Sequence, residues 1–369
     1  MRAALFEAPH TDLAIVDDVE IEDPHAGEVR VRISYCGVCH SDLHFVEGQL
    51  PSPMPAILGH EAAGIVEAVG LGVEDLVEGD KVILTLAPPC GRCYFCARGE
   101  VHLCARATSL ATGTLPDGGT RLSHRGRVVY RGVGLGGWAE QAITPASGAV
   151  KIPDDTPLEV ACLLGCAVQT GVGAVLNTAK VPEGATVVVV GLGGVGISAV
   201  QGARLAGASR IIGVDPVASR REQALRFGAT DLVDPASGEL STTCMELTGG
   251  IGVDHAIDTA ATAATMTACV SGLRSGGSLV VVGVPGFEAR IELPVISWAL
   301  SEKKVTGSFL GSSNPHLEFP RLLSLWRAGR LDLEGMVTAT RPLEELPLAF
   351  EDMKAGRGLR TVVDLGAGS

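Results

Sequence analysis

Apolar residues follow two different patterns along the chain, and the change of pattern divides it into two parts. Up to about residue 150, short strand-like segments such as Glu28–Ile33, Gly64–Val69 and Lys81–Leu84 are separated by turns. Short strands bounded by turn residues are typical of an antiparallel β domain. We therefore expect a β-rich domain over residues 1–167.

Beyond residue 167 apolar runs alternate with alanine-rich helical stretches. The runs cover residues 186–190, 211–214, 231–233, 253–257, 278–282 and 305–309. Largely apolar strands joined by crossover helices are typical of a parallel sheet that is covered on both faces. We therefore predict an α/β domain over 168–309, with a six-stranded, doubly wound parallel sheet. The mixed helix and strand pattern of 310–369 returns to the first domain.

A glycine-rich motif follows the first run of the second domain. The residues Gly191, Gly193 and Gly196 form G-x-G-x-x-G between a valine-rich strand and a helical stretch. This motif permits a tight turn, close approach of the backbone to a pyrophosphate, and anion binding at the helix N-terminus. A glycine-rich turn in an ordinary α/β domain is the alternative, and the residue that ends the next strand argues against it.

That residue is Asp215, which lies 24 positions after Gly191. A carboxylate there accepts hydrogen bonds from both hydroxyls of the adenosine ribose and repels a 2′-phosphate. The sequence therefore predicts NAD rather than NADP as the cofactor. Arg220, five residues further on, would reduce this preference for NAD over NADP by attracting the 2′-phosphate.

The charge and the termini restrict the partners and the location. The formal net charge of −13 disfavours binding to nucleic acids and to anionic membranes. No apolar stretch reaches the roughly 20 residues that a membrane span needs, and the N-terminus lacks the pattern of a signal peptide. We expect a cytoplasmic protein, in which the ten cysteines stay reduced and the clustered ones bind metal.

Four of these cysteines share one 15-residue segment. Cys90, Cys93, Cys96 and Cys104 have the spacing C-x2-C-x2-C-x7-C, which is suited to a closed tetrahedral zinc site. A structural zinc is the preferred interpretation. The rival, a zinc-ribbon module that binds nucleic acid, is disfavoured by the negative charge.

Further metal-ligand side chains are scattered. They occur between Cys36 and His44 and again in the triplet Gly59-His60-Glu61. Ligands far apart in sequence suit an open catalytic site. A lone histidine can equally be a core residue whose ring nitrogens are hydrogen-bonded within the protein. Spacing alone leaves both interpretations open.

Taken together, these motifs resemble the zinc-dependent alcohol dehydrogenases of the medium-chain dehydrogenase/reductase superfamily, from about residue 1 to 366. The resemblance implies a GroES-like catalytic domain, a Rossmann domain and two zinc ions per chain. It places the catalytic zinc on Cys39, His60 and Cys166, and the structural zinc on the four-cysteine segment. A cysteine at position 166 is similar to the alcohol dehydrogenases, whereas polyol dehydrogenases have glutamate there.

The resemblance also implies cofactor contacts beyond the glycine motif. It assigns Thr170, Val282 and Val284 to the nicotinamide side and Arg360 to the pyrophosphate. His40 stands where many animal members have an arginine on the pyrophosphate. An imidazole there is a weaker, pH-dependent partner, which predicts looser NAD binding.

A proton route completes the predicted site. Ser41 takes the proton of the alcohol and His44 receives it at the solvent edge, through a cofactor ribose hydroxyl as in the family. Asp42 orients the imidazole of His60. The alternatives are a surface histidine at position 44 and a helix cap at position 42.

The predicted activity is hydride transfer between NAD and an alcohol, giving an aldehyde or ketone. Leu86 and Gly132 stand where related enzymes have aromatic rings, so we expect a roomy pocket for bulky primary or secondary alcohols of aromatic or terpenoid type. Glutathione-dependent formaldehyde oxidation is disfavoured, since Leu50 replaces an acidic residue. The segment 112–133 favours a homodimer over a homotetramer. The alternative function is a catalytically inactive NAD-binding structural or sensor protein.

Overall fold

The computed structural model describes residues 1–107, 109–285 and 289–366. Within these residues the chain forms two compact units. The first unit contains Met1–Cys166, Asn314–Gly329 and the chain from Leu333 onward, and the second contains Ala167–Ser313 and Arg330–Asp332. Residues 310–313 and 330–332 therefore group with the second unit.

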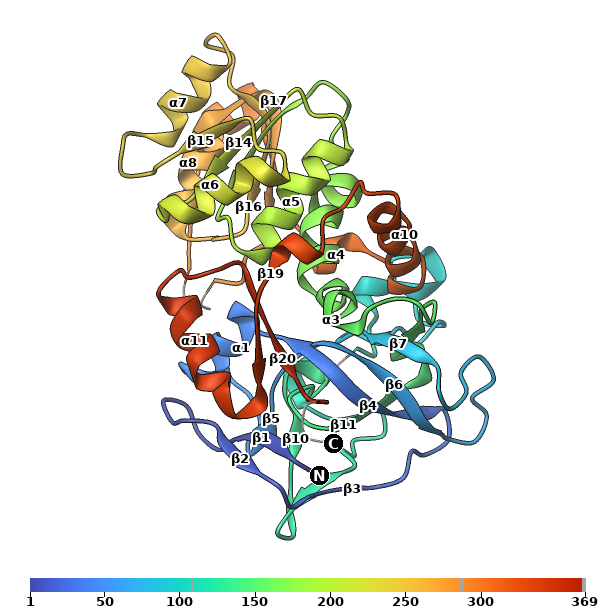
Figure 1. Ribbon diagram of the computed structural model, residues 1–369. Helices are drawn as coiled ribbons and strands as arrows, with labels where there is room; N and C mark the ends of the chain where they lie inside the picture. Colours follow the sequence, from blue (N-terminus) through green and yellow to red (C-terminus); the bar gives the residue numbers. More distant parts are fainter. Residues whose placement is uncertain (108, 286–288, 367–369) are drawn as a thin grey trace. The chain divides into compact units, whose positions relative to one another are not determined.

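The largest sheet of the first unit has seven strands, in the order β12-β7-β6-β4-β20-β19, and β11 also pairs with β4 (Figure 1). Its strands are β4 (Glu28–Gly37), β6 (Glu61–Val69), β7 (Lys81–Leu84), β11 (Gln141–Pro145), β12 (Ala149–Lys151), β19 (Val337–Pro342) and β20 (Arg360–Asp364). Strand β20 runs antiparallel to β4, with Val362 opposite Gly37. The beginning of the last strand thus lies beside the end of β4.

Two smaller sheets complete the β structure of this unit. One has the order β10-β5-β1-β2 and the other β3-β8-β9. Their strands are β1 (Ala3–Phe6), β2 (Ala14–Val16), β3 (Val19–Ile21), β5 (Ala56–Ile57), β8 (Leu122–His124), β9 (Arg127–Val128) and β10 (Tyr130–Arg131). All of β1 and β5 is buried, and these residues form one apolar core together with Trp138 and Phe350.

The α-helices of the first unit range from four to 13 residues in length. They are α1 (His40–Val46), α2 (Ser109–Thr112), α3 (Leu158–Ala161), α10 (Pro315–Arg327) and α11 (Leu346–Lys354). Helix α10 is capped by the side chain of Asn314, which accepts a hydrogen bond from the His316 N–H, and it has a proline at its first position. Both features are typical of helix N-termini.

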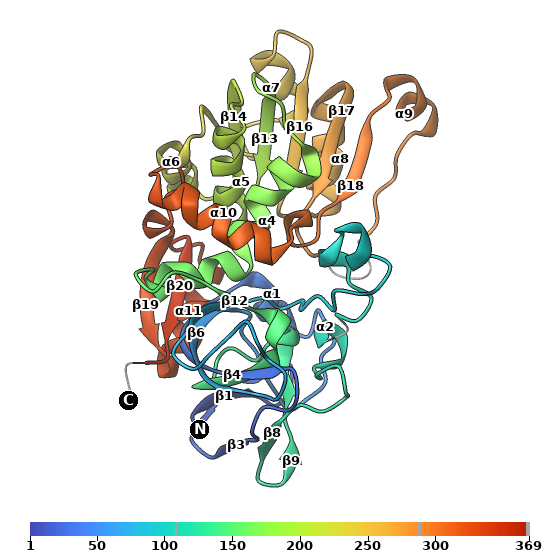
Figure 2. The ribbon, with the colours of Figure 1, turned by 90° about the vertical axis from the view of Figure 1, so that its right-hand side faces the viewer.

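The second unit contains the predicted six-stranded sheet, and all its neighbouring strands are parallel. Its order is β15-β14-β13-β16-β17-β18, and Figure 2 shows β14, β13, β16, β17 and β18 in that order. The strands are β13 (Thr186–Val190), β14 (Arg210–Val214), β15 (Asp231–Val233), β16 (Val253–Asp258), β17 (Leu273–Val281) and β18 (Lys304–Gly307). The helices are α4 (Ala167–Gly173), α5 (Gly194–Leu205), α6 (Ala218–Phe227), α7 (Leu240–Leu247), α8 (Ala263–Gly272) and α9 (Val295–Ser301), and the π-helical turn Ala174–Ala179 continues α4.

The strand order reverses between β13 and β16. From β13 the chain moves outward through β14 to β15 and then crosses back to β16 on the other side of β13. In doubly wound sheets a ligand-binding crevice opens where the strand order reverses, at the carboxyl ends of the strands. The glycine motif begins directly after β13 and therefore lies at this point.

Among the described residues no single helix is long and apolar enough to cross a membrane. The segments 158–165 and 167–179 meet the criteria of length and composition only when taken together, and they are bent by 53°.

Candidate metal and nucleotide sites

A buried cluster of metal-ligand side chains lies at the end of β4 and the start of β6. The possible ligand atoms of Cys39, His60, Glu61 and Cys166 lie within 4.8 Å of one another. Cys39 precedes α1, His60 precedes β6, and Cys166 ends the turn after α3. The structure thus brings together the three residues that the resemblance named and adds Glu61, which the sequence analysis passed over although it adjoins His60.

Asp42 holds this cluster in place. Its carboxylate is fully buried, and Oδ1 accepts hydrogen bonds from His60 Nδ1 at 3.1 Å and from the Gly59 N–H at 3.0 Å. The Cys39 N–H donates to Oδ2 at 3.3 Å. Because His60 Nδ1 is engaged by the carboxylate, Nε2 is left as the ligating atom. Asp42 therefore makes the contact expected of an orienting carboxylate and also caps α1.

The charge balance of the cluster depends on a buried ion pair between Arg360 and Glu61. Arg360 Nη2 lies 2.7 Å from Glu61 Oε1, and Nη1 donates to the Val38 carbonyl at 2.8 Å. Burial raises the pKa of Glu61 to about 7, although the guanidinium opposes this shift. Gly37 faces the pair, since a Cβ there would lie 2.3 Å from Glu61 Oε2. The expected contact of Arg360 with a pyrophosphate stays a prediction.

Electrostatics also favour metal binding at Cys39. A hydrogen bond from the Cys166 thiol lowers the pKa of Cys39 well below its usual value, and the positive charges of Arg360 and His60 add to this effect against the opposing effect of burial. Two thiolates and one imidazole form a ligand set that zinc prefers. The residues present therefore fit a zinc ion held by Cys39, His60 and Cys166, with Glu61 neutralised by its arginine.

Two residues of the predicted proton route lie on α1, next to this cluster. The Ser41 hydroxyl lies 3.9 Å from the Cys39 sulfur. His44, three residues later and on the same helix face, donates from Nδ1 to the side-chain oxygen of Gln49. Its Nε2 therefore carries the lone pair that accepts a proton. No hydrogen bond joins Ser41 to His44 within the described residues, and His40 is exposed, with its ring 6.4 Å from that of His44.

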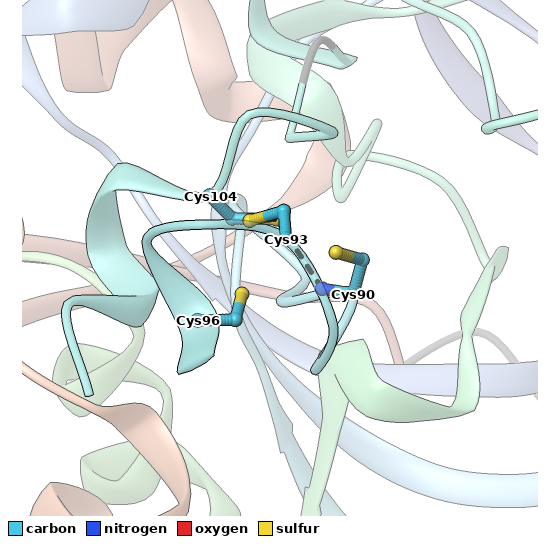
Figure 3. Close-up of side chains that lie close together, drawn as sticks. All are labelled: Cys90, Cys93, Cys96 and Cys104. Carbon is cyan, nitrogen blue, oxygen red and sulfur yellow. Dashed lines mark hydrogen bonds between the residues drawn. The ribbon is translucent and has the colours of Figure 1, made fainter. Parts of the chain in front are cut away.

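The four cysteines of the predicted structural site converge on one point (Figure 3). Their sulfur atoms lie within 4.8 Å of one another, compared with about 3.8 Å between sulfurs around a tetrahedral zinc. Backbone N–H groups of Cys96 and Ala105 lower the pKa of Cys93 to about 6. The Cys90 N–H also donates to the Cys104 sulfur at 3.3 Å. These donors stabilise thiolates at two of the cysteines, whereas burial raises the pKa of Cys96 to about 12. Four converging sulfur ligands fit a closed zinc site.

At the nucleotide motif, the three glycines differ in what their positions require. Gly191 has φ +85°, a conformation that glycine adopts without strain. A Cβ on Gly196 would lie 1.7 Å from the Gly191 carbonyl oxygen, whereas a Cβ on Gly193 would meet no atom within 4 Å. Gly196 therefore permits close packing of helix α5 on the turn, and Gly193 leaves open space beside the first N–H groups of that helix.

Asp215 lies beside this turn, at the end of β14. Its carboxylate accepts hydrogen bonds from the N–H groups of Leu192 and Val217, both at 2.8 Å. Arg221, which the sequence analysis did not name, donates to the Asp215 carbonyl at 2.5 Å and to Asp234 at 2.9 Å. The Nε of Arg220 is buried without a hydrogen-bond partner in the described part of the chain.

The residues assigned to the nicotinamide side lie in two segments of the second unit. Thr170 is buried in α4, and its hydroxyl has no hydrogen-bond partner among the described residues. Val282 is buried and donates its N–H to the Asp258 carbonyl at 2.9 Å, whereas Val284 is exposed. A buried hydroxyl without a partner fits a position that a cofactor would satisfy.

The expectation that Gly132 leaves room for substrate is wrong. A Cβ at Gly132 would lie 2.4 Å from a methyl carbon of Leu58 and 2.7 Å from the Ile57 carbonyl oxygen. The missing side chain therefore corresponds to close packing against β5 rather than to open pocket space. Leu86 is buried and remains a candidate for the substrate pocket.

Comparisons with known proteins agree with this fold. Residues 25–154 match the family "Alcohol dehydrogenase GroES-like domain", and residues 194–327 match "Zinc-binding dehydrogenase". The chain is 38% identical over 353 residues to alcohol dehydrogenase B of Mycobacterium tuberculosis, covering 94% of both chains.

Solved structures are similar over nearly the whole chain. Benzyl alcohol dehydrogenase from Acinetobacter calcoaceticus has a TM-score of 0.93 at 31% identity and covers 98% of both chains. An alcohol dehydrogenase from Escherichia coli CFT073, complexed with NADH, has a TM-score of 0.81 at 25% identity and covers 99% of both chains. The chain therefore belongs to the zinc-dependent alcohol dehydrogenases of the medium-chain dehydrogenase/reductase superfamily and is an oxidoreductase.

Proposed function

We propose that this alcohol dehydrogenase transfers hydride between NAD and alcohols with large apolar groups, and that each chain holds two zinc ions. The observation that carries the proposal is the buried set of Cys39, His60 and Cys166, with Asp42 holding the imidazole so that Nε2 is free to ligate. Three protein ligands around zinc leave one position for a substrate oxygen, as in catalytic zinc sites. The four-cysteine segment has a closed set of ligands and would bind the structural zinc ion.

When bound, zinc supplies a Lewis acid that favours the alkoxide form of the alcohol, and NAD supplies the hydride acceptor. The side chains beside the cluster accept the proton that the alcohol loses and transfer it towards solvent. The Ser41 hydroxyl lies 3.9 Å from the sulfur of the ligand Cys39. It accepts this proton and donates its own hydroxyl proton towards His44, through a ribose hydroxyl of the cofactor. His44 Nε2 is the final acceptor, because its other nitrogen is held by Gln49.

The preference for NAD rests on Asp215. Its carboxylate is buried beside the glycine turn, where a 2′-phosphate would bring like charges together. Asp215→Gly removes this repulsion together with the ribose hydrogen bonds, so the ratio of kcat/KM for NAD to that for NADP should fall. Equal values for the two cofactors in the wild type would contradict the assignment.

The preference for bulky alcohols has two supports. Leu86 is an aliphatic residue where related enzymes have a ring, and the similar structure from Acinetobacter is a benzyl alcohol dehydrogenase. Each additional buried methylene group contributes about 0.8 kcal/mol, so benzyl alcohol should exceed ethanol in kcat/KM. Leu86→Phe should depress activity on benzyl or cinnamyl alcohol more than on ethanol.

One set of measurements tests the whole proposal. Elemental analysis should find two zinc ions per chain, and NADH absorbance should rise when benzyl alcohol and NAD are added. Two zinc ions without turnover of any alcohol in a broad panel would instead favour an inactive NAD-binding protein. Ethanol as the best substrate would overturn the assignment of substrate size, and one zinc ion or none would overturn the proposed metal chemistry.

The proposal extends to assembly and location. On α9 the side chains of Val295, Ile296 and Leu300 are 82%, 74% and 81% exposed. Strand β18 pairs with β17 and forms one edge of the parallel sheet. An apolar helix face and a sheet edge in one unit are suited to contact with a second copy of the chain, which supports a homodimer.

All ten cysteines are free, which suits the reducing cytoplasm.

A further inference from the structure

Arg131, at the end of β10, is a buried cation that forms no ion pair with any residue that the structure describes. The residue is 1% exposed, and its Nε and Nη2 have no hydrogen-bond partner within the described residues. Glu28 is the carboxylate whose charge acts on it, but Glu28 is already bonded to Arg121 at 2.8 and 3.2 Å. Burial lowers the pKa of Arg131 to about 10, so the guanidinium remains charged at neutral pH. An uncompensated buried charge is costly, which indicates that something else satisfies it.

Arg131 lines a pocket in the first unit. The pocket holds about 260 Å³ of empty space, including solvent at its mouth. Its other polar side chains are the exposed Arg106, the buried Ser109 and the half-buried Thr114. The residues that line it include two arginines and no carboxylate. The pocket is therefore positively charged at its base and at its rim.

Two hydroxyl groups of the pocket are held by weak or local contacts. Ser109 Oγ lies 3.5 Å from the Leu86 carbonyl, and Thr114 Oγ1 lies 2.8 Å from the Thr112 hydroxyl. Both hydroxyls can also take part in hydrogen bonds to a ligand, because a hydroxyl both donates and accepts. Prolines 88, 116 and 145 form apolar walls and carry no backbone N–H that would add a further donor.

We propose that this pocket binds a small phosphate-type oxoanion, with the Arg131 guanidinium at its base and Arg106 at its rim. Guanidinium groups bind phosphate through paired, charge-assisted hydrogen bonds. Donors that approach from two arginines and two hydroxyls suit the tetrahedral oxygens of phosphate better than a planar monocarboxylate. None of these residues belongs to the zinc clusters or to the glycine turn, so the site is additional to those of the proposed function.

The test is a titration of the zinc-loaded protein with inorganic phosphate, at constant ionic strength set with chloride and with NADH present to occupy the nucleotide site. Calorimetry should show saturable binding. Phosphate should also raise the melting temperature, because a bound ligand adds RT ln(1 + [L]/Kd) to the free energy of unfolding. Arg131→Met should weaken phosphate binding by about tenfold or more and reduce the rise in melting temperature at the same phosphate concentration. Arg127→Met, which removes an exposed arginine of the neighbouring strand β9, is the matched control and should behave like the wild type.

Two further measurements keep the proposal falsifiable. If Arg131→Met does not fold, Arg106→Met combined with Ser109→Ala should still lower the affinity for phosphate while Arg131 is retained. Acetate at the same ionic strength should bind at least about tenfold more weakly. Equal phosphate affinity in the wild type and in Arg131→Met, no saturable binding in the wild type, or acetate binding as tight as that of phosphate would overturn the proposal.

Discussion

Asp42 connects three parts of the metal cluster through one buried carboxylate. It accepts hydrogen bonds from the imidazole of His60, from the Gly59 N–H and from the Cys39 N–H. One side chain therefore sets the orientation of the histidine ligand and the start of the helix that follows the cysteine ligand. A change at Asp42 should act on zinc through these ligands rather than by direct contact.

Replacing the carboxylate by an amide should weaken zinc binding at the cluster. Asp42→Asn keeps the size of the side chain, but the amide is a poorer acceptor for His60 and for two N–H groups. Loss of such a supporting partner typically lowers metal affinity 10–100-fold. Zinc content measured against a chelator series should fall by one ion per chain, while the four-cysteine ion is retained. Asp12→Asn, at an exposed position, is the control, and unchanged chelator sensitivity in Asp42→Asn would refute the positioning role.

His44 is expected to govern how turnover depends on pH. His44→Gln removes the Nε2 lone pair that accepts the proton, so kcat should fall mainly below mildly alkaline pH. Above that range hydroxide can take the proton directly. Added imidazole buffer should partly restore kcat, and His25→Gln, on the exposed surface, should leave the profile unchanged. A profile that coincides with that of the wild type would show that the proton leaves by another route.

The junction of β13 and α5 offers a matched pair of glycines. A Cβ at Gly196 would meet a backbone carbonyl at 1.7 Å, which the turn cannot relieve without moving, whereas Gly193 faces open space. Gly196→Ala should therefore lower the melting temperature by several degrees, through steric strain of about 1–3 kcal/mol. Gly193→Ala should preserve the melting temperature but weaken NADH binding, measured by fluorescence titration. Equal melting temperatures for the two variants would contradict the packing role of Gly196.

The four-cysteine segment should contribute stability rather than catalysis. Cys104→Ser should remove one zinc ion and lower the melting temperature, because a closed thiolate site contributes folding free energy. Cys39→Ser should instead abolish turnover with the fold retained.

The folded-state pKa of Cys93, about 6, lies below that of an ordinary thiol. The Cys93 thiolate therefore stabilises the folded state in full above the ordinary thiol pKa, and this contribution to the free energy of unfolding is lost as the pH falls through about 6. Zinc should be released from the segment as the pH falls, because protons compete with the ion for the thiolates, and a zinc-sensitive dye would follow the release. An unchanged melting temperature in Cys104→Ser would argue against a structural role.

In the whole molecule, the apolar face of α9 should be covered by a second copy of the chain. Ile296→Asp places a charge in the middle of this face and should convert dimers to monomers, measured by light scattering after size-exclusion chromatography. Leu71→Asp, at a leucine of the first unit that is 87% exposed, is the control and should leave the mass unchanged. A monomeric wild type, or a dimer that tolerates Ile296→Asp, would exclude this face as the interface.

Much of this molecule follows from patterns that span few residues. The apolar runs and their spacing predict the six parallel strands, and the order strand, glycine motif, helix predicts the turn before α5. The four cysteines lie within 15 residues, so their spacing alone brings the sulfurs within reach of one ion. Such features are predictable because short segments restrict the geometry that their own residues can adopt.

Other features depend on parts of the chain that only folding brings together. Glu61 and Arg360 are separated by 299 positions, and nothing in either segment indicates that they pair beside the zinc ligands. Gly132 illustrates the same limit, since its missing side chain indicates open space until Leu58 is found to fill it. Arg131 resembles many other arginines in the sequence. That its Nε and Nη2 lack a partner in the described part of the chain appears only when burial is known. Burial and long-range pairing are properties of the packed chain, because they depend on which distant residues exclude water from a side chain.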